Sequence, residues 1–119
     1  MIVYLEKSTT KSNISPRIDF SYLYNIVILS MPVISMFYGL IVSMYYLDNK
    51  QHHLPHIHVR FGEEEAVYEI PSGKQLAGSI PTNKEKLLLA WIEIHGDNLM
   101  ADWTLASQGM KVFAIDPLK

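Results

Sequence analysis

The sequence predicts an α+β domain in which helices pack on one face of a mostly antiparallel sheet of four to five strands. Apolar or alternating segments of strand length lie between residues 22 and 70. Apolar residues then recur at helical spacing from residue 83 to residue 107. A last short apolar segment at residues 111–115 predicts a closing strand. Strands followed by helices favour helices segregated to one side of the sheet.

Length and composition indicate one globular domain. The chain has 119 residues, of which 49% are hydrophobic and 18% charged, so it can bury a core and is too apolar for disorder. We predict a single domain over residues 31–119, preceded by an N-terminal extension at residues 1–30 that could add an edge strand. Cysteine is absent, which excludes disulfides and makes the cytoplasm the expected location. The net charge of −2 excludes a basic surface over the whole chain, so any RNA contact would be local.

An uncharged run between Asp19 and Asp48 is long enough to cross a bilayer. Serines, a proline and a glycine are spread through it, however, and tyrosines and β-branched residues are frequent. This composition favours buried strands over a membrane helix. We therefore predict strands broken near Pro32, with Gly39 as a bend or bulge, residues 40–47 as the central strand, and no membrane contact.

Histidines gather in one short segment. Four of the chain's five histidines lie in HHLPHIHV, residues 52–59. If residues 56–61 form a strand, His56, His58 and Arg60 share one face and their apolar neighbours share the other. One face would pack on the core, and the other would present two imidazoles and a guanidinium.

The segment after this strand also alternates and predicts a hairpin. A two-residue turn would place Arg60 opposite Glu65 and His56 opposite Glu69. A four-residue turn would place His58 opposite Glu69. Both registers keep the apolar residues on one face and bring a carboxylate near the histidines.

The histidine segment has three interpretations. As a metal site, His56 and His58 would bind a divalent ion such as zinc, with further ligands from His52 or His53, a carboxylate, or His95. As an acid–base site, the imidazoles would transfer protons while the guanidinium stabilises an anion, which suits RNA cleavage through the 2′-hydroxyl. As a surface, it would be a solvated strand face with an ion-paired arginine.

The helical region begins with a capping signal. Thr82 and Glu85 have the spacing of a capping box. Gly96 predicts a kink or break, and Asp97 would cap a second helix. His95 lies on the apolar stripe, where a buried structural histidine is the simpler interpretation.

Four blocks of the chain resemble a family of small bacterial proteins catalogued as a domain of unknown function. The blocks are MPVISMFYGLIVSMYYLD, HLPHIHVRFGEEEAVYEI, LLLAWIEIHGDNLMADW and the closing AIDPL. They occur in order at similar spacing, and the resemblance covers residues 31–119. The resemblance assigns His53, His56 and His58 to the histidine motif and places His95 on the helix.

The resemblance implies the toxin component of a type II toxin–antitoxin pair. The implied partner is a cognate antitoxin, either a DNA-binding helix-turn-helix protein or a small partner domain. We expect the toxin to act on RNA or the translation machinery, as a ribonuclease-like enzyme. A metal-dependent hydrolase and a non-enzymatic protein-binding module are the alternatives, and exposed sheet edges would suit a partner or a homo-oligomer.

The expected site combines residues from the strand, the loop before it and the helix. His56 and His58 would act as acid and base or as metal ligands, and Arg60 would contact a phosphate. His53 would be the third member of the cluster. Glu69 would orient an imidazole, and His95 would support the site. The full expected set is His53, His56, His58, Arg60, Glu69 and His95.

Overall fold

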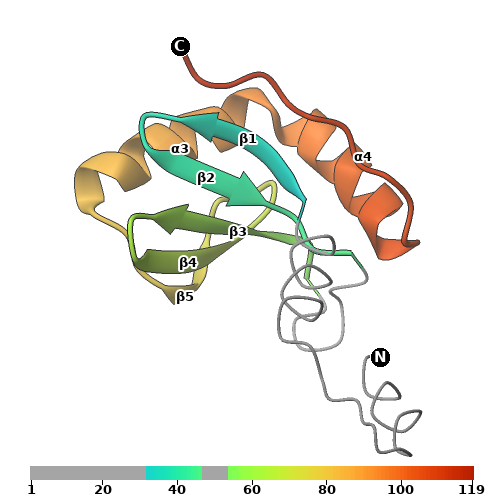
Figure 1. Cartoon of the computed structure of the whole chain (residues 1–119), viewed down its shortest axis with the longest axis horizontal. Coiled ribbons are helices and arrows are strands. Elements are labelled where there is room, and N and C mark those ends of the chain that lie inside the picture. Colours follow the sequence, from blue (N-terminus) through green and yellow to red (C-terminus); the bar gives the residue numbers. More distant parts are fainter. Residues whose placement is uncertain (1–31, 47–53) are drawn as a thin grey trace, which may run out of the picture. The chain divides into compact units, whose positions relative to one another are not determined.

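The computed structural model describes residues 32–46 and 54–119. Two of our predictions, the strand within residues 1–30 and the role of His53, therefore lie outside the described residues. The described elements, shown in Figure 1, are β1 (Val33–Phe37), β2 (Leu40–Ser43), β3 (His56–Phe61), β4 (Glu64–Glu69), β5 (Gln75–Gly78), α3 (Thr82–Ile94) and α4 (Gly96–Ser107).

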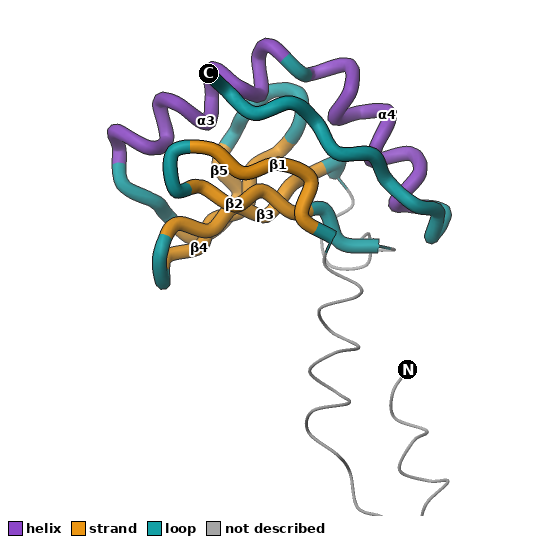
Figure 2. Tube along the Cα trace, turned by 45° about the horizontal axis from the view of Figure 1, so that its top comes forward, coloured by secondary structure: helices purple, strands orange, loops and turns teal. Residues whose placement is uncertain are grey.

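The strands form one sheet in the order β1-β2-β3-β4-β5, and all neighbours are antiparallel. Both helices lie on the same face of this sheet (Figure 2). The α+β prediction is confirmed. The prediction that residues 40–47 form the central strand is wrong, because β3 lies in the middle of the described sheet and β2 ends at Ser43. The apolar character of β2 reflects its burial and not its place in the sheet.

The chain reverses fully at Tyr38 and Gly39. Their φ angles are +49° and +84°, and Phe37 pairs directly with Leu40. Two successive positive φ angles are typical of the two-residue turns that match the twist of a hairpin. Gly39 therefore lies in the turn between β1 and β2, whereas we expected a bend or bulge there.

The hairpin of β3 and β4 has the two-residue register. Phe61 pairs with Glu64 across the turn, so Arg60 lies opposite Glu65 and His56 opposite Glu69. Paired residues of antiparallel strands point to the same face. The register thus fixes which side chains accompany the histidines.

The core lies between the sheet and the helices. Leu88, Trp91 and Ile92 of α3 and Leu99 of α4 are buried against it. The Trp91 ring lies 5.2 Å from the Phe37 ring. The apolar stripe along the helical region is what buries it on the sheet.

The predicted helix is broken, as Gly96 indicated. α3 ends at Ile94 and α4 begins at Gly96. The residue at the N-cap of α4 is His95, and Asp97 lies one position inside the first turn. The expectation that Asp97 caps α4 is therefore wrong, because α4 begins two residues earlier than it would if Asp97 were its N-cap.

The predicted capping box at the start of α3 is also wrong. Pro81 holds the N-cap position, and no side chain caps the helix. The Glu85 carboxylate instead accepts a hydrogen bond of 2.8 Å from the Tyr68 hydroxyl. Tyr68 is fully buried, and a buried hydroxyl needs a partner. Burial and this carboxylate both raise the pKa of Tyr68.

The C-terminal segment (residues 108–119) crosses beside β1 without forming a strand. Its Ile115 N–H donates to the Ile34 carbonyl at 2.8 Å. Its Phe113 N–H donates to the Asp102 carboxylate at 3.0 Å. The prediction of a strand at residues 111–115 is wrong because a side chain of α4 takes a donor that a strand ladder would use.

No helix within the described part of the chain has both the length and the apolar character needed to span a membrane.

Candidate functional site

His56 and His58 lie on β3, the central strand of the described sheet. Alternation along β3 directs His56, His58 and Arg60 toward the same side of the strand. Their exposure increases along the strand: His56 is 1% exposed, His58 is half-buried and Arg60 is exposed. The face is therefore not the evenly solvated surface that one interpretation described.

His56 is enclosed at the end of the sheet that α4 approaches. Its ring lies 5.1 Å from the Trp103 ring and 5.2 Å from the His58 ring. Its Nδ1 lies 2.7 Å from the Leu54 carbonyl oxygen. A carbonyl only accepts, so Nδ1 carries the proton in this contact. The backbone thereby fixes both the tautomer and the orientation of the His56 ring.

His58 forms a flat aromatic pair with Tyr45. The two rings are nearly parallel, at 4°, and their centroids are 4.0 Å apart. His58 lies opposite Ser43 on β2 and Val67 on β4. Both members of the pair are half-buried, so each residue is partly exposed to solvent.

Arg60 provides the cationic end of the strand face. Its guanidinium pairs with the Glu65 carboxylate across the hairpin, and both side chains are about half exposed. An exposed ion pair contributes at most about 1 kcal/mol. A phosphate can therefore compete with Glu65 for this guanidinium at low energetic cost.

Glu69 lies opposite His56 in the strand register. Its carboxylate accepts a hydrogen bond of 2.9 Å from the Ser72 hydroxyl, in the turn that follows β4. The carboxylate thus helps to order this turn. The orienting role that we expected for Glu69 remains a prediction.

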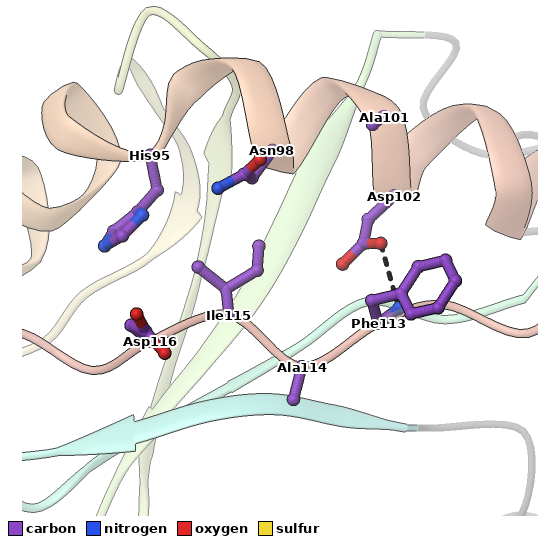
Figure 3. A pocket seen from close by; sticks show the side chains of 8 residues that line it. All are labelled: His95, Asn98, Ala101, Asp102, Phe113, Ala114, Ile115 and Asp116. Atoms are coloured by element: carbon purple, nitrogen blue, oxygen red, sulfur yellow. Dashed lines mark hydrogen bonds between the residues drawn. The ribbon is translucent and has the colours of Figure 1, made fainter.

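His95 belongs to a different part of the molecule. It lies at the junction of α3 and α4, with its ring 5.5 Å from the Trp91 ring. It lines a pocket of about 310 Å³ between α4 and the C-terminal segment (Figure 3). No residue of β3 lines this pocket. The structure therefore places His56, His58 and Arg60 on one face of β3, and His95 in the lining of the pocket beside α4.

A zinc site at the histidine segment remains a prediction. Within residues 32–46 and 54–119, no three histidine or acidic side chains are grouped closely enough to hold a metal ion. The third expected ligand, His53, lies outside these ranges. His56 and His58 can contribute two imidazoles to a divalent ion, which usually needs three or four protein ligands.

Asp102 is a functional candidate that the sequence did not reveal. It is 2% exposed, and one carboxylate oxygen accepts the Phe113 N–H. Its Oδ2 is buried and has no hydrogen-bond partner among the described residues. Its burial could have been predicted from its helical spacing from Leu99 and Ala106, which are buried on the same helix face.

Burial raises the pKa of Asp102 above the ordinary 3.8 of an aspartate, and the Phe113 N–H lowers it in part. As pH rises past that ordinary value, the unfolded chain loses its proton while folded Asp102 keeps it. The contribution of Asp102 to the free energy of unfolding therefore falls until pH passes the raised pKa, with a slope of at most about 1.4 kcal/mol per pH unit.

We expect Asp102→Asn to lack this fall. Urea denaturation of both proteins from about pH 3 to about pH 8 measures this. The free energy of unfolding of the variant should rise relative to that of the wild type as pH rises. Asp97→Asn, at an exposed position of the same helix, controls for the change in net charge. A difference between Asp102→Asn and wild type that stays constant with pH would contradict this account.

Comparison with known protein families finds a match to this chain. The model of a family described as domain of unknown function DUF4160 matches residues 39–104, more than half of the chain. The match runs from the turn before β2 into α4 and includes the histidine strand. No curated protein and no solved structure is detectably similar to the chain.

Proposed function

We propose, from the premise that this chain belongs to the DUF4160 family of domains of unknown function, that it is the toxin component of a bacterial toxin–antitoxin pair and acts on RNA in the cytoplasm. The proposed site is the face of β3 that carries His58 and Arg60. The observation that carries the proposal is the parallel stack of Tyr45 on His58 beside an exposed guanidinium.

This arrangement suits a single-stranded RNA. Unpaired bases stack on aromatic side chains displayed by a sheet, and a base could extend the Tyr45–His58 pair in this way. Arg60 lies two residues from His58 on the same strand face. The rise per residue of a strand puts their Cα atoms about 6.5–7 Å apart. Its planar guanidinium is suited to the phosphate that follows a stacked base.

The two histidines have different roles in this proposal. His58 reaches solvent, so its imidazole can remove the proton of a 2′-hydroxyl, whose oxygen then bonds to the adjacent phosphorus. The P–O5′ bond breaks in this step, the leaving 5′-oxygen takes a proton from water, and a 2′,3′-cyclic phosphate remains. Arg60 would stabilise the negative charge that develops on the phosphate. His56 is buried with its ring 5.2 Å from the His58 ring, and we assign it a positioning role.

Expression of the chain in a bacterial host should arrest growth, and His58→Asn should remove the arrest. Purified His58→Asn should cleave single-stranded RNA at least about a hundredfold more slowly than wild type, because general acid–base catalysis contributes that much or more. His58 is the choice because His56 is enclosed, so a variant at His56 would also disturb packing.

His58→Phe separates stacking from proton transfer. Phenylalanine keeps a flat ring against Tyr45 but has no nitrogen, so this variant should still bind RNA and fail to cleave it. Arg60→Gln should weaken RNA binding, whereas Lys74→Gln removes the same charge at an exposed position beside β5 and should not. Growth arrest by a folded His58→Asn protein would refute the proposed site.

The metal-dependent alternative uses the same histidines. Elemental analysis of the purified wild type and His58→Asn would test it. Stoichiometric zinc or another divalent metal that is lost in the variant would support a metal-dependent hydrolase. Cleavage by a protein without stoichiometric metal would support the metal-free reaction.

A non-enzymatic protein-binding module is the second candidate. Exposed apolar side chains on β1 favour it, because Val33 is 49% and Met36 61% exposed. A cognate antitoxin, either a helix-turn-helix protein or a small partner domain, is the expected partner in both proposals. RNA turnover that depends on His58 discriminates the enzyme from the binding module.

A further inference from the structure

The pocket between α4 and the C-terminal segment has an acidic, hydrogen-bonding lining. Its polar side chains are His95, Asn98, Asp102 and Asp116. None of the described lysines or arginines lines it, and its remaining walls are formed by small or apolar side chains. Its volume of about 310 Å³ is at the lower end of the range for small-molecule sites. The lining is thus complementary to a compact ligand that carries positive charge.

One group in this pocket points directly to a ligand. Asp102 is 98% buried, since only 2% of it is exposed, and its Oδ2 has no hydrogen-bond partner among the described residues. Figure 3 shows the other oxygen engaged by the Phe113 N–H while Oδ2 points into the space between α4 and the C-terminal segment. Buried acceptors are almost always satisfied, so an orphan carboxylate oxygen in a pocket implies a donor from outside the domain.

We propose that this pocket binds a guanidinium group, with Asp102 Oδ2 as the buried acceptor and Asp116 as the second carboxylate. The two carboxylates come from different elements, α4 and the C-terminal segment, and lie on different sides of the pocket (Figure 3). A guanidinium carries donors around its planar edge, so one group can reach acceptors on two walls.

The burial of Asp102 favours a guanidinium over an ammonium ion. An ammonium is a compact, strongly hydrated charge, and it loses more on leaving water. A guanidinium is more weakly hydrated, and its flat faces tolerate apolar walls such as Ala101 and Ile115. A neutral donor of the same shape would satisfy Oδ2 but would leave the negative charge uncompensated.

Two hydrogen bonds hold the walls of the pocket. Trp91 Nε1–H donates to the Asp116 carbonyl at 2.8 Å, which anchors the C-terminal segment beside the pocket. The Phe113 N–H holds the Asp102 carboxylate from the opposite side. Preorganised walls reduce the entropy lost on binding.

The test is a titration of the full chain with methylguanidinium chloride, followed by NMR of the backbone amides at neutral pH. Amides near Ala101, Asp102 and Ala114 should shift in a saturable manner. Methylammonium and urea, which share the charge or the planar shape, should bind at least about tenfold more weakly, since a charge-assisted hydrogen bond corresponds to that factor or more.

Asp102→Asn should weaken methylguanidinium binding at least about tenfold, because the amide keeps an acceptor for Phe113 but presents donors to the ligand. Asp97→Asn is the matched control, since it removes the same charge from an exposed position of α4 outside the pocket and should leave binding unchanged. Asp116→Asn gives a second test if Asp102→Asn does not fold.

The source of the group is distinguished by a capped Gly-Arg-Gly peptide. Tighter binding of this peptide than of methylguanidinium would indicate an arginine side chain of a polypeptide. Binding of methylguanidinium alone would indicate a free guanidino compound. Shifts that do not saturate, or that are equal for all three small probes, would overturn the proposal.

Discussion

Replacing Trp91 with alanine is expected to lower the free energy of unfolding by about 3–5 kcal/mol, the cost typical of a large aromatic removed from a core. Trp91 is fully buried and packs on Phe37 across the sheet–helix interface. Its indole also holds the C-terminal segment through the Asp116 carbonyl. Equilibrium urea denaturation, followed by circular dichroism, would measure the loss.

Trp91→Phe separates packing from hydrogen bonding. It keeps an aromatic ring in the core but removes the donor to Asp116, so most of the loss should be recovered. The lost hydrogen bond should cost about 1 kcal/mol, in addition to the cost of the smaller ring. Equal losses for the two variants would show that the hydrogen bond, and not the packing, gives Trp91 its importance.

Gly78→Ala is expected to lower the free energy of unfolding by about 2–5 kcal/mol, the sum of a left-handed backbone and an overpacked contact. Gly78 ends β5 with φ at +69°. A Cβ atom there would lie 2.1 Å from the Glu65 carbonyl oxygen and 2.9 Å from the Ala66 Cα. Both are backbone atoms of β4, so the two strands would have to separate.

Gly62→Ala is the matched control for Gly78→Ala. Gly62 has a similar φ of +62°, but a Cβ atom there would meet nothing within 4 Å. Its variant should therefore carry only the cost of the left-handed backbone, about 1–2 kcal/mol. The difference between the variants measures the strand contact, and equal losses would show that β4 and β5 do not approach this closely.

The parts of the fold that were predictable depend on local periodicity. Alternation over residues 56–61 identified β3, and the pairing of charged and apolar residues across a two-residue turn gave one of the two registers considered. Helical spacing and Gly96 predicted a helical region that is kinked or broken at Gly96, and the structure has two helices there. Each of these signals is contained within a few neighbouring residues.

The errors arose where a distant residue decides the local structure. Residues 111–115 have strand propensity, but Asp102 takes the Phe113 N–H. Glu85 has the spacing of a capping residue, but the buried Tyr68 hydroxyl takes its carboxylate. β5 was missed because its four residues, Gln75–Gly78, are short and largely exposed. It carries little hydrophobic pattern for a sequence to reveal.

In the candidate site too, local sequence patterns were predictive and contacts with distant residues were not. Period-2 alternation placed His56, His58 and Arg60 on one face, but it could not show that Trp103 of α4 encloses His56. Nor could it reveal Tyr45 as the stacking partner of His58. The sequence between these two residues has no periodic pattern that relates their positions. Asp102 was hidden because an acidic residue on a helix is usually solvated.

The hydrogen bond from Ile115 to Ile34 has a consequence for how copies of this chain interact. An uncovered edge strand can recruit another chain and extend a sheet, which leads to polymerisation. Here a newcomer at β1 would first have to displace the C-terminal segment. At the opposite edge, β5 offers only four residues and ends at a left-handed glycine. Intermolecular strand addition is thus opposed at both edges of the described sheet, by occlusion at one and by brevity at the other.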